Sequence, residues 1–442
     1  MKVGFFLSSF LPRHTGGTEI YVYRLICELQ KNNISCFVLN SSAEEFATTY
    51  IYKGIRIIPV PSSVSDKEAR FKMLEQIICD EQPDLFHVHE LTGPDGFTVL
   101  DLEYFKKQSI PVATTLHVLR YSCFMQDLRY LGKFECDGLP GALKCTKCFL
   151  TRKKVGVFTQ PVILLSEFLF NNHVRSAFLS GKISTMCNSY SIVFEHIQTL
   201  HKIITLSNAV VAITKWYHGI LQGIVPFNKL HLIQTGSFFM DVNSVREKSD
   251  GLVLGYLGRL TPDKGIDLLI DAFISIKDNP DQLKIFADIS NLEDSFVLSL
   301  VNKTRFFSNV QWCNPFQPDD TQNELAQLDV VVVPTRITEM SPLVIHEAKA
   351  MGKFILASNN RGNKEILEDY ANAYIYEENT IHTLSVAMQH VQHNYSPLSD
   401  FTKRDDQDTF EETARQYLSL YKNLLIEHFD HKTSDISVDV QA

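Results

Sequence analysis

Two glutamates, Glu339 and Glu347, flank a Ser-Pro step in ITEMSPLVIHEAKAMG, which follows the apolar run LDVVVVP. Ser341 is a good N-cap, and Pro342 suits the first helical position because its missing N–H needs no partner there. The sequence therefore predicts that a buried strand gives way to a helix at 342. The free backbone N–H groups at a helix start bind anions, and a phosphate is the anion we expect here.

The two carboxylates are spaced to bind polyols on either side of that phosphate. Glu339 lies in the loop, and Glu347 lies on the helix, whose side chains lean back toward its N-terminus. A carboxylate accepts two hydrogen bonds and matches a vicinal diol, so the stretch predicts a nucleotide-sugar site. The alternative is a surface carboxylate at 339 and helix-face ion pairs at 347. The residues expected around the phosphate are Ser341, Pro342, Leu343 and Val344.

A second charged group lies in LVLGYLGRLTPDKGIDLLIDAF. Gly258 ends a predicted strand, and Arg259 and Lys264 flank the turn that precedes a helix. Two cations beside a turn can hold a diphosphate and stabilise the negative charge that develops when it leaves, so no metal is required for catalysis. The alternative is a pair of solvated surface cations.

The first half of the chain has glycines and a histidine where a parallel sheet would bind a ligand. In LPRHTGGTEIYVYRL, Gly16 and Gly17 let the backbone approach a ligand, and Thr18 is expected to cap the next helix. His117 ends the predicted strand PVATTLH at the ligand edge of the sheet, although a lone histidine there is more often structural. The chain lacks a G-x-G-x-x-G fingerprint and a P-loop, which argues against dinucleotide or ATP use.

Four of the nine cysteines fall within CFMQDLRYLGKFECDGLPGALKCTKC: Cys123, Cys136, Cys145 and Cys148. Four thiolates with one C-x-x-C step suit a tetrahedral structural zinc, which would stabilise a loop that has little core of its own. The alternative is four reduced thiols packed in a loop. An odd number of cysteines argues against a disulfide framework.

The elements that position these residues alternate between apolar strand-like runs and helical periodicity. This alternation predicts an α/β fold with two doubly wound, Rossmann-like domains. The expected parts are an N-terminal domain (1–240) with a cysteine-bearing insertion (118–205), a linker (240–251), a C-terminal domain (252–405), a helix (406–429) and a disordered tail (430–442).

The composition is that of a soluble globular protein, with 45% hydrophobic and 21% charged residues among 442. The net charge of −9 would repel nucleic acid, and no basic run offsets it. No stretch reaches the roughly 18 uninterrupted apolar residues that a membrane span needs, so the expected location is the cytoplasm.

Taken together, these motifs resemble the group 1 family of retaining GT-B glycosyltransferases, which includes bacterial polysaccharide and lipopolysaccharide sugar transferases. The resemblance covers residues 1–425 and is strongest in GYLGRLTPDKGIDLLIDAF and PTRITEMSPLVIHEAKAMGKFILAS, which contains the E-x7-E pattern. It implies two Rossmann-like domains that face a cleft, with the C-terminal helix crossing back to the N-terminal domain. The C-terminal domain would bind the nucleotide sugar, and the N-terminal domain would bind the acceptor.

Carried over by position, the resemblance implies that Glu339 contacts the donor sugar and Glu347 the ribose. The amides after Ser341, with the two cations, would hold the diphosphate. Gly17 would lie near the reacting centre, and His117 would reach the donor sugar or the developing charge. Such enzymes retain the anomeric configuration without a convincing carboxylate nucleophile, so front-face attack, in which the leaving diphosphate helps to deprotonate the acceptor, is implied.

The sequence departs from the family pattern in four places. Val118 follows the histidine where an aspartate is common, and LKIFADIS lacks the usual glycines. Cys313 replaces a frequent glycine, and NNRGNKE has only Gly362 where two glycines are typical. The second and third departures lie where the base is usually bound, so they leave the nucleotide open.

The predicted function is retaining transfer of a sugar from a nucleotide-diphosphate sugar to a glycan or lipid-linked acceptor in cell-surface polysaccharide synthesis. The alternatives are a nucleotide-sugar epimerase of the same fold and a non-catalytic partner subunit that retains the fold. The apolar helices of the insertion are candidates for peripheral membrane contact, or they are core. Membrane contact would place the protein at the inner face of the cell membrane.

Overall fold

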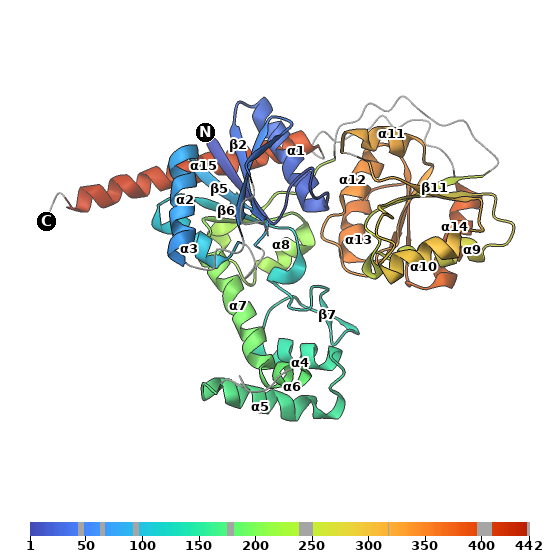
Figure 1. The fold of residues 1–442 in the computed structure, drawn as a ribbon, viewed down its shortest axis with the longest axis horizontal. Helices are drawn as coiled ribbons and strands as arrows, with labels where there is room; N and C mark the ends of the chain where they lie inside the picture. The colour runs from blue at the N-terminus through green and yellow to red at the C-terminus, as the bar shows by residue number, and fades with distance from the viewer. Residues whose placement is uncertain are drawn as a thin grey trace. The chain divides into compact units, whose positions relative to one another are not determined.

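The computed structural model describes residues 1–42, 48–61, 67–91, 97–174, 181–237, 251–316, 318–395 and 409–439, with the backbone alone for 430–439. The chain forms two compact units (Figure 1): unit 1 is Met1–Gln234 with Ala414–Ala442, and unit 2 is Thr235–Thr413. The first segment of unit 1 ends at residue 234, whereas the sequence predicts that the N-terminal domain ends at residue 240. All of the predicted linker except residue 251 lies outside the described residues.

The described residues of unit 1 form an eight-stranded sheet in the order β10-β9-β6-β5-β1-β2-β4-β3, and among these strands only β3 pairs antiparallel. Strands β5, β6 and β9 are buried at every residue, as expected of apolar runs covered on both faces. The strands are β1 (Lys2–Leu7), β2 (Ser35–Ser42), β3 (Tyr50–Tyr52), β4 (Ile55–Pro61), β5 (Leu85–Val88), β6 (Val112–Leu116), β9 (Ala209–Ala212) and β10 (Leu230–Leu232). The accompanying helices are α1 (Gly17–Lys31), α2 (Lys67–Glu81), α3 (Val99–Lys107) and α8 (Lys215–Leu221).

The described residues of the predicted insertion form a short hairpin and four α-helices, which lie below the sheet in Figure 1. Its own small core consists of Phe149, Leu150, Ile163, Val193 and Ile197. The elements are β7 (Arg129–Tyr130), β8 (Phe134–Glu135), α4 (Ala142–Arg152), α5 (Thr159–Asn171), α6 (Gly181–Cys187) and α7 (Ser189–Leu206). Helix α7 contacts α3 and thereby joins this cluster to the main body of unit 1.

Unit 2 contains a six-stranded parallel sheet in the order β13-β12-β11-β14-β15-β16. The chain winds outward from β11 in one direction and from β14 in the other, so these two neighbours form the topological switch point. Ligands of doubly wound sheets bind outside the carboxyl ends of strands at such a point. The strands are β11 (Val253–Leu257), β12 (Gln282–Phe286), β13 (Val310–Cys313), β14 (Val330–Val333), β15 (Phe354–Ser358) and β16 (Ala373–Tyr376). The helices are α9 (Ile266–Ser275), α10 (Ser295–Thr304), α11 (Thr321–Ala326), α12 (Leu343–Ala350), α13 (Arg361–Leu367) and α14 (Ile381–Asn394).

The last helix, α15 (Phe410–Asp439), begins in unit 2 and returns to unit 1, as the resemblance implies. The Phe410 amide donates to the Ser237 carbonyl at 2.9 Å, and Tyr417 and Tyr421 are fully buried in unit 1. The backbone of α15 is helical to Asp439, and the disordered tail over 430–442 stays a prediction. Within the described ranges, none of the helices is both long and apolar enough to cross a membrane.

Candidate functional site

The switch point of unit 2 brings together a predicted cation and a predicted carboxylate that lie 75 residues apart in the chain. Lys264 Nζ lies 2.5 Å from Glu339 Oε1, and the two side chains are 24% and 15% exposed. Thr335, just after β14, donates its hydroxyl to the same Glu339 oxygen at 3.0 Å. The Glu339 carboxylate is therefore held in one orientation at the ligand edge of the sheet.

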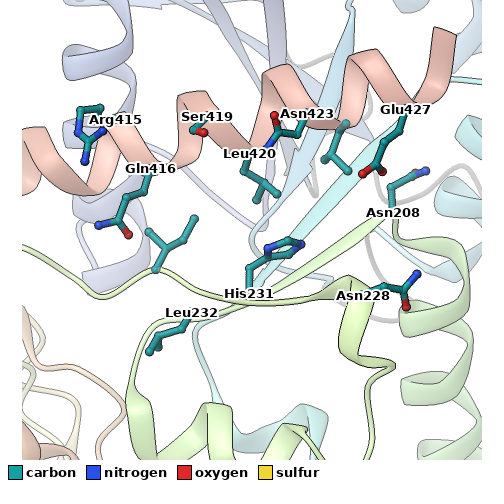
Figure 2. Close-up of a pocket in the computed structure, with 12 residues that line it drawn as sticks. Asn208, Asn228, His231, Leu232, Arg415, Gln416, Ser419, Leu420, Asn423 and Glu427 are labelled. Carbon is teal, nitrogen blue, oxygen red and sulfur yellow. The ribbon is translucent and has the colours of Figure 1, made fainter. Parts of the chain in front are cut away.

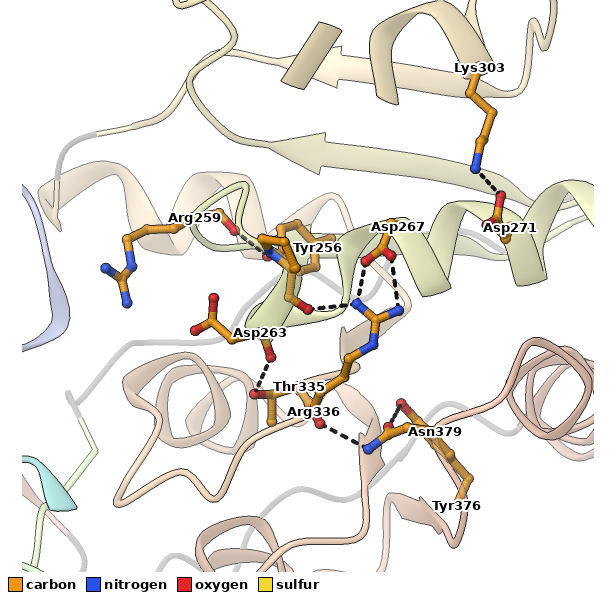
Figure 3. Close-up of polar contacts among 11 residues, drawn as sticks. Tyr256, Arg259, Asp263, Asp267, Asp271, Lys303, Thr335, Arg336, Tyr376 and Asn379 are labelled. Atoms are coloured by element: carbon orange, nitrogen blue, oxygen red, sulfur yellow. Dashed lines mark hydrogen bonds and ion pairs between the residues drawn. The ribbon is translucent and has the colours of Figure 1, made fainter. Parts of the chain in front are cut away.

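Arg336 contacts the residues on both sides of Lys264, and Figure 3 shows its pairing with Asp267. Its guanidinium contacts the Asp267 carboxylate at 2.6 and 3.0 Å and donates to the Pro262 carbonyl at 2.6 Å. Its backbone amide donates to the Asp263 carbonyl at 2.8 Å. The sequence gives no specific signal for Arg336, which is a basic residue three positions after the end of β14.

Two glycines permit the close packing around this site. Gly265 has φ of +71°, and a Cβ there would lie 2.0 Å from the Pro334 carbonyl oxygen at the end of β14. A Cβ at Gly362, in α13, would lie 2.2 Å from the Glu339 carbonyl oxygen. The backbones that carry Lys264 and Glu339 thus meet their neighbours at distances that exclude a side chain.

Arg259 is exposed, and within the described residues its side chain has no hydrogen-bond or ion-pair partner. Its guanidinium points away from the other side chains drawn in Figure 3. Its carbonyl accepts a 2.7 Å hydrogen bond from the Tyr256 hydroxyl, and burial raises the pKa of this tyrosine. A Cβ at Gly258 would lie 3.1 Å from the same hydroxyl. The geometry leaves the Arg259 guanidinium available to an anion.

The start of α12 differs from the prediction by one residue. Pro342 is the N-cap with extended backbone (φ −64°, ψ 116°), and the helix begins at Leu343. The Ser341 hydroxyl does not cap the helix, because it contacts His346 Nε2 at 2.8 Å. In the described part of the chain the amides of Leu343 and Val344 have no acceptor, so these two N–H groups are available to an anion, and the phosphate site stays a prediction.

Glu347 lies in the same helix and is 8% exposed. The side chain for which the resemblance implies a contact with the ribose is therefore largely covered. Its contact with the donor stays a prediction.

In unit 1, His117 belongs to a row of three histidines at the carboxyl ends of β5 and β6, in which His87 and His89 are buried and His117 is partly exposed. His117 Nε2 lies 2.7 Å from His89 Nδ1, and His89 Nε2 lies 3.1 Å from His87 Nδ1. The Tyr421 hydroxyl of α15 lies 2.6 Å from His87 Nδ1, and the Tyr21 ring of α1 contacts the His117 ring at 4.8 Å between centroids. We call these residues, His87, His89 and His117, the histidine chain.

Burial keeps the histidine chain neutral. It lowers the pKa of His117 to about 3, and it lowers the pKa of His87 and His89 well below 6.5, with help from the neighbouring rings. A neutral His117 can exchange a hydrogen bond with a ligand but cannot offer a full positive charge at pH 7. The contact of His117 with the donor stays a prediction.

The histidine chain predicts that the protein loses stability in mild acid. Between pH 6.5 and about 3 the unfolded state binds more protons at these histidines than the folded state, so the free energy of unfolding falls as pH falls. Each histidine contributes up to about 1.4 kcal/mol per pH unit. Thermal unfolding measured from pH 7 to 5.5 checks this, because ordinary carboxyl groups stay ionised there. A melting temperature that is constant over that range would contradict the prediction.

The predicted glycine loop lies at the start of α1. Gly16 is the N-cap, so the prediction that Thr18 caps the helix is wrong. A Cβ at Gly16 would lie 2.5 Å from Glu19 Oε2, whereas nothing lies within 4 Å of a Cβ at Gly17. The Glu19 carboxylate is buried, accepts from the Ser9 hydroxyl at 2.7 Å and lies 2.9 Å from His14 Nδ1. The sequence alone did not predict a role for Glu19 in this loop.

The structure brings the four predicted zinc ligands together. Cys123, Cys136, Cys145 and Cys148 line one cavity of about 20 Å³ in unit 1. The Leu131 amide donates to Cys148 Sγ at 3.2 Å. Across the described residues, however, no three His, Cys, Asp or Glu side chains are arranged as ligands of one metal ion. The structural zinc stays a prediction.

A further cavity, of about 420 Å³, lies between α15 and the edge strand β10 (Figure 2). Asn208 and Asn228 line it and precede β9 and β10, so it extends to the amino ends of these strands. Ligands of parallel sheets bind at the carboxyl ends, and none of the predicted site residues lines this cavity. We do not assign it to the donor.

Two family models match the chain. Residues 240–409 match Glycosyl transferases group 1, and residues 11–136 match Glycosyl transferase 4-like. The first of these segments contains the Lys264–Glu339 pair, and the second contains Gly17 and His117.

Relatives of known name are distant. Glycogen synthase of Francisella tularensis subsp. tularensis (strain SCHU S4 / Schu 4) is 22% identical over 95% of this chain and 88% of the relative. Glycogen synthase of Francisella tularensis subsp. holarctica (strain LVS) is 23% identical over 41% of this chain, and this match spans 40% of that relative's length. Lipopolysaccharide 1,2-N-acetylglucosaminetransferase of Salmonella typhimurium is 29% identical over 28% of this chain and 35% of the relative.

Solved structures show the fold. Sucrose-phosphate synthase from Thermosynechococcus elongatus matches with a TM-score of 0.59 at 14% identity, covering 99% of both chains. Anabaena HepE, solved in complex with UDP and glucose, matches with a TM-score of 0.57 at 14% identity, also covering 99% of both chains. At this identity the likeness establishes the architecture, which is GT-B.

Proposed function

We propose that this chain, a glycosyltransferase with the GT-B fold, moves a sugar from a nucleotide-diphosphate sugar to a glycan or lipid-linked acceptor with retention of configuration. The observation that carries the proposal is the Lys264–Glu339 pair at the switch point of unit 2. Arg259 lies in the same connection after β11 as Lys264, and its side chain is exposed. Leu343 and Val344 begin the helix α12, which follows the loop that carries Glu339. Carboxylate, amides and cations are the groups that a sugar diphosphate requires.

The diphosphate would bind the α12 amides, with Arg259 and Lys264 offsetting its charge. As the bond from the anomeric carbon to the diphosphate oxygen breaks, negative charge grows on that oxygen, and fixed N–H donors stabilise it more in the transition state than in the ground state. Two protein cations and two amides can supply this stabilisation, so we propose catalysis that is independent of metal.

Glu339 is proposed to position the donor sugar rather than to attack it. Its Oε1 already accepts from Lys264 and Thr335, which reduces the nucleophilicity of the carboxylate. Retention then requires the acceptor hydroxyl to attack the anomeric carbon from the face that the diphosphate leaves. The acceptor proton passes to the departing diphosphate oxygen, which balances the step.

The setting we propose is cell-surface polysaccharide synthesis at the cytoplasmic face of the membrane. The partial match to a lipopolysaccharide sugar transferase supports a glycan or lipid-linked acceptor. UDP sugars are the first donors to test, because Anabaena HepE was solved with UDP-glucose.

A thermal-shift screen with UDP-, GDP- and ADP-sugars tests donor binding. A ligand at 100 times its dissociation constant adds about 2.7 kcal/mol to the free energy of unfolding and raises the melting temperature. Arg259→Ala should weaken binding of the active donor about tenfold or more, because a charge-assisted hydrogen bond is lost. The matched control, Arg305→Ala, removes an exposed arginine of unit 2 that stacks on Phe306, and should bind as the parent does.

Release of nucleoside diphosphate separates the candidate functions. Release that needs an acceptor supports transfer, whereas sugar interconversion without release would indicate an epimerase. Donor binding without turnover, across a broad set of acceptors, would indicate a non-catalytic subunit. No melting shift with any nucleotide sugar would contradict the proposal.

A further inference from the structure

Helix α5 presents an apolar side to solvent. It buries Ile163 and Ser166 against the rest of unit 1, where the Ser189 hydroxyl donates to the Ser166 hydroxyl at 3.2 Å. Its other side carries Leu164, Leu165 and Phe168, which are 58%, 48% and 62% exposed. A helix on the outside of a soluble domain normally turns polar residues outward, so this surface needs a partner.

The apolar surface continues into the turn before α5. Val157 and Phe158 are 88% and 65% exposed and directly precede the helix. Together with Leu164, Leu165 and Phe168 they recur at the spacing of one helical face. We call these five residues the α5 apolar face. Figure 1 draws α5 at the end of its helix cluster away from the unit 1 sheet.

The segment around the α5 apolar face is strongly basic. Residues 142–187 contain seven Lys and Arg against one acidic residue, Glu167, although the whole chain has a net charge of −9. Lys153 and Lys154 are exposed and immediately precede the turn that carries Val157. The segment that carries the α5 apolar face therefore has a net positive charge, whereas the whole chain has a net negative charge.

We infer that the α5 apolar face docks on an anionic membrane surface. An amphipathic helix with basic flanks binds in the plane of the lipid headgroups, with its apolar side chains in the acyl boundary and its cations on anionic lipid. With 13 residues, α5 is too short to cross a bilayer, so it lies on the surface. A second copy of the chain is a poorer partner, because paired α5 faces would bring two basic segments together.

This inference does not depend on the proposed chemistry. Docking on a membrane would, however, bring the protein close to a lipid-linked acceptor. The test is co-sedimentation of the full chain with vesicles of phosphatidylcholine alone and with a third phosphatidylglycerol. We expect binding to the anionic vesicles that weakens as salt is added. Leu164→Gln with Phe168→Gln should lower the partition coefficient about tenfold or more, because two apolar side chains no longer leave water.

Lys153→Gln with Lys154→Gln should lower binding to anionic vesicles by about fivefold per lysine and leave binding to neutral vesicles unchanged. The matched control is Phe227→Gln, which changes a 91% exposed aromatic of unit 1 outside the α5 apolar face and should bind as the parent does. Thermal unfolding verifies that each variant folds. The inference is overturned if the parent stays in the supernatant, or if Leu164→Gln with Phe168→Gln sediments equally well. It is also overturned if those changes dissociate a dimer without affecting vesicle binding.

Discussion

Glu339→Gln is expected to lower sugar transfer about a thousandfold while the protein remains folded. The substitution keeps the size of the side chain but removes the negative charge that pairs with Lys264 and accepts from Thr335. It converts a double acceptor for sugar hydroxyls into a group with one oxygen. The measurement is release of nucleoside diphosphate in the presence of acceptor, with the donor that the melting screen identifies.

The matched control for Glu339→Gln is Asp271→Asn. Asp271 and Lys303 form a similar carboxylate–lysine pair at 2.6 Å in the same unit, away from the switch point (Figure 3). Each substitution removes one ion pair and should change the free energy of unfolding by about 1 kcal/mol or less. Only Glu339→Gln should affect transfer. Equal turnover by the two variants would show that the carboxylate at 339 has no part in the reaction.

Gly265→Ala is expected to cost about 3 kcal/mol of stability and to lower transfer about a hundredfold. The new Cβ would lie 2.0 Å from the Pro334 carbonyl oxygen, and the backbone φ of +71° is strained for an L residue with a side chain. The backbone around residue 265 must move to relieve this clash, and the movement would displace the adjacent Lys264. Misplacing a catalytic group by about 1 Å costs roughly a hundredfold in rate.

Gly219→Ala is the control for this second prediction. Gly219 lies inside α8 of unit 1, and nothing lies within 4 Å of a Cβ placed there. Alanine should stabilise that helix by about 0.5–1 kcal/mol and leave transfer unchanged. Chemical denaturation and nucleoside diphosphate release measure both variants. Parental stability in Gly265→Ala would mean that the turn at 262–265 accommodates a side chain.

The positions of several candidate site residues in the fold were predictable because their signals are local. The apolar run VVVV predicted the buried strand β14, and the residues after it belong at the ligand edge of a parallel sheet. The basic residues after β11 followed from the same rule. Even the start of α12 was predicted within one residue, since Pro342 cannot occupy a helix interior.

Other residues had no signal that one sequence could give. Nothing in the sequence near Arg336 indicates its partner. The structure pairs it with Asp267, which lies 69 positions earlier in the chain. His87 and Tyr421 lie 334 positions apart, and only packing of α15 on unit 1 makes them partners. Ser341 looked like a cap because its type favours that role, but its hydroxyl contacts His346 instead.

The sequence by itself determined the alternation of strands and helices, the two-domain architecture and the residue types that suit a sugar diphosphate. These follow from patterns within about 20 residues, where burial and helix capping act on neighbouring side chains. The tertiary structure alone decided that β11 lies beside β14, that Lys264 pairs with Glu339, and that the histidine chain is neutral. Strand order depends on which apolar faces pack together across the whole chain, and a histidine's pKa depends on the burial that this packing creates.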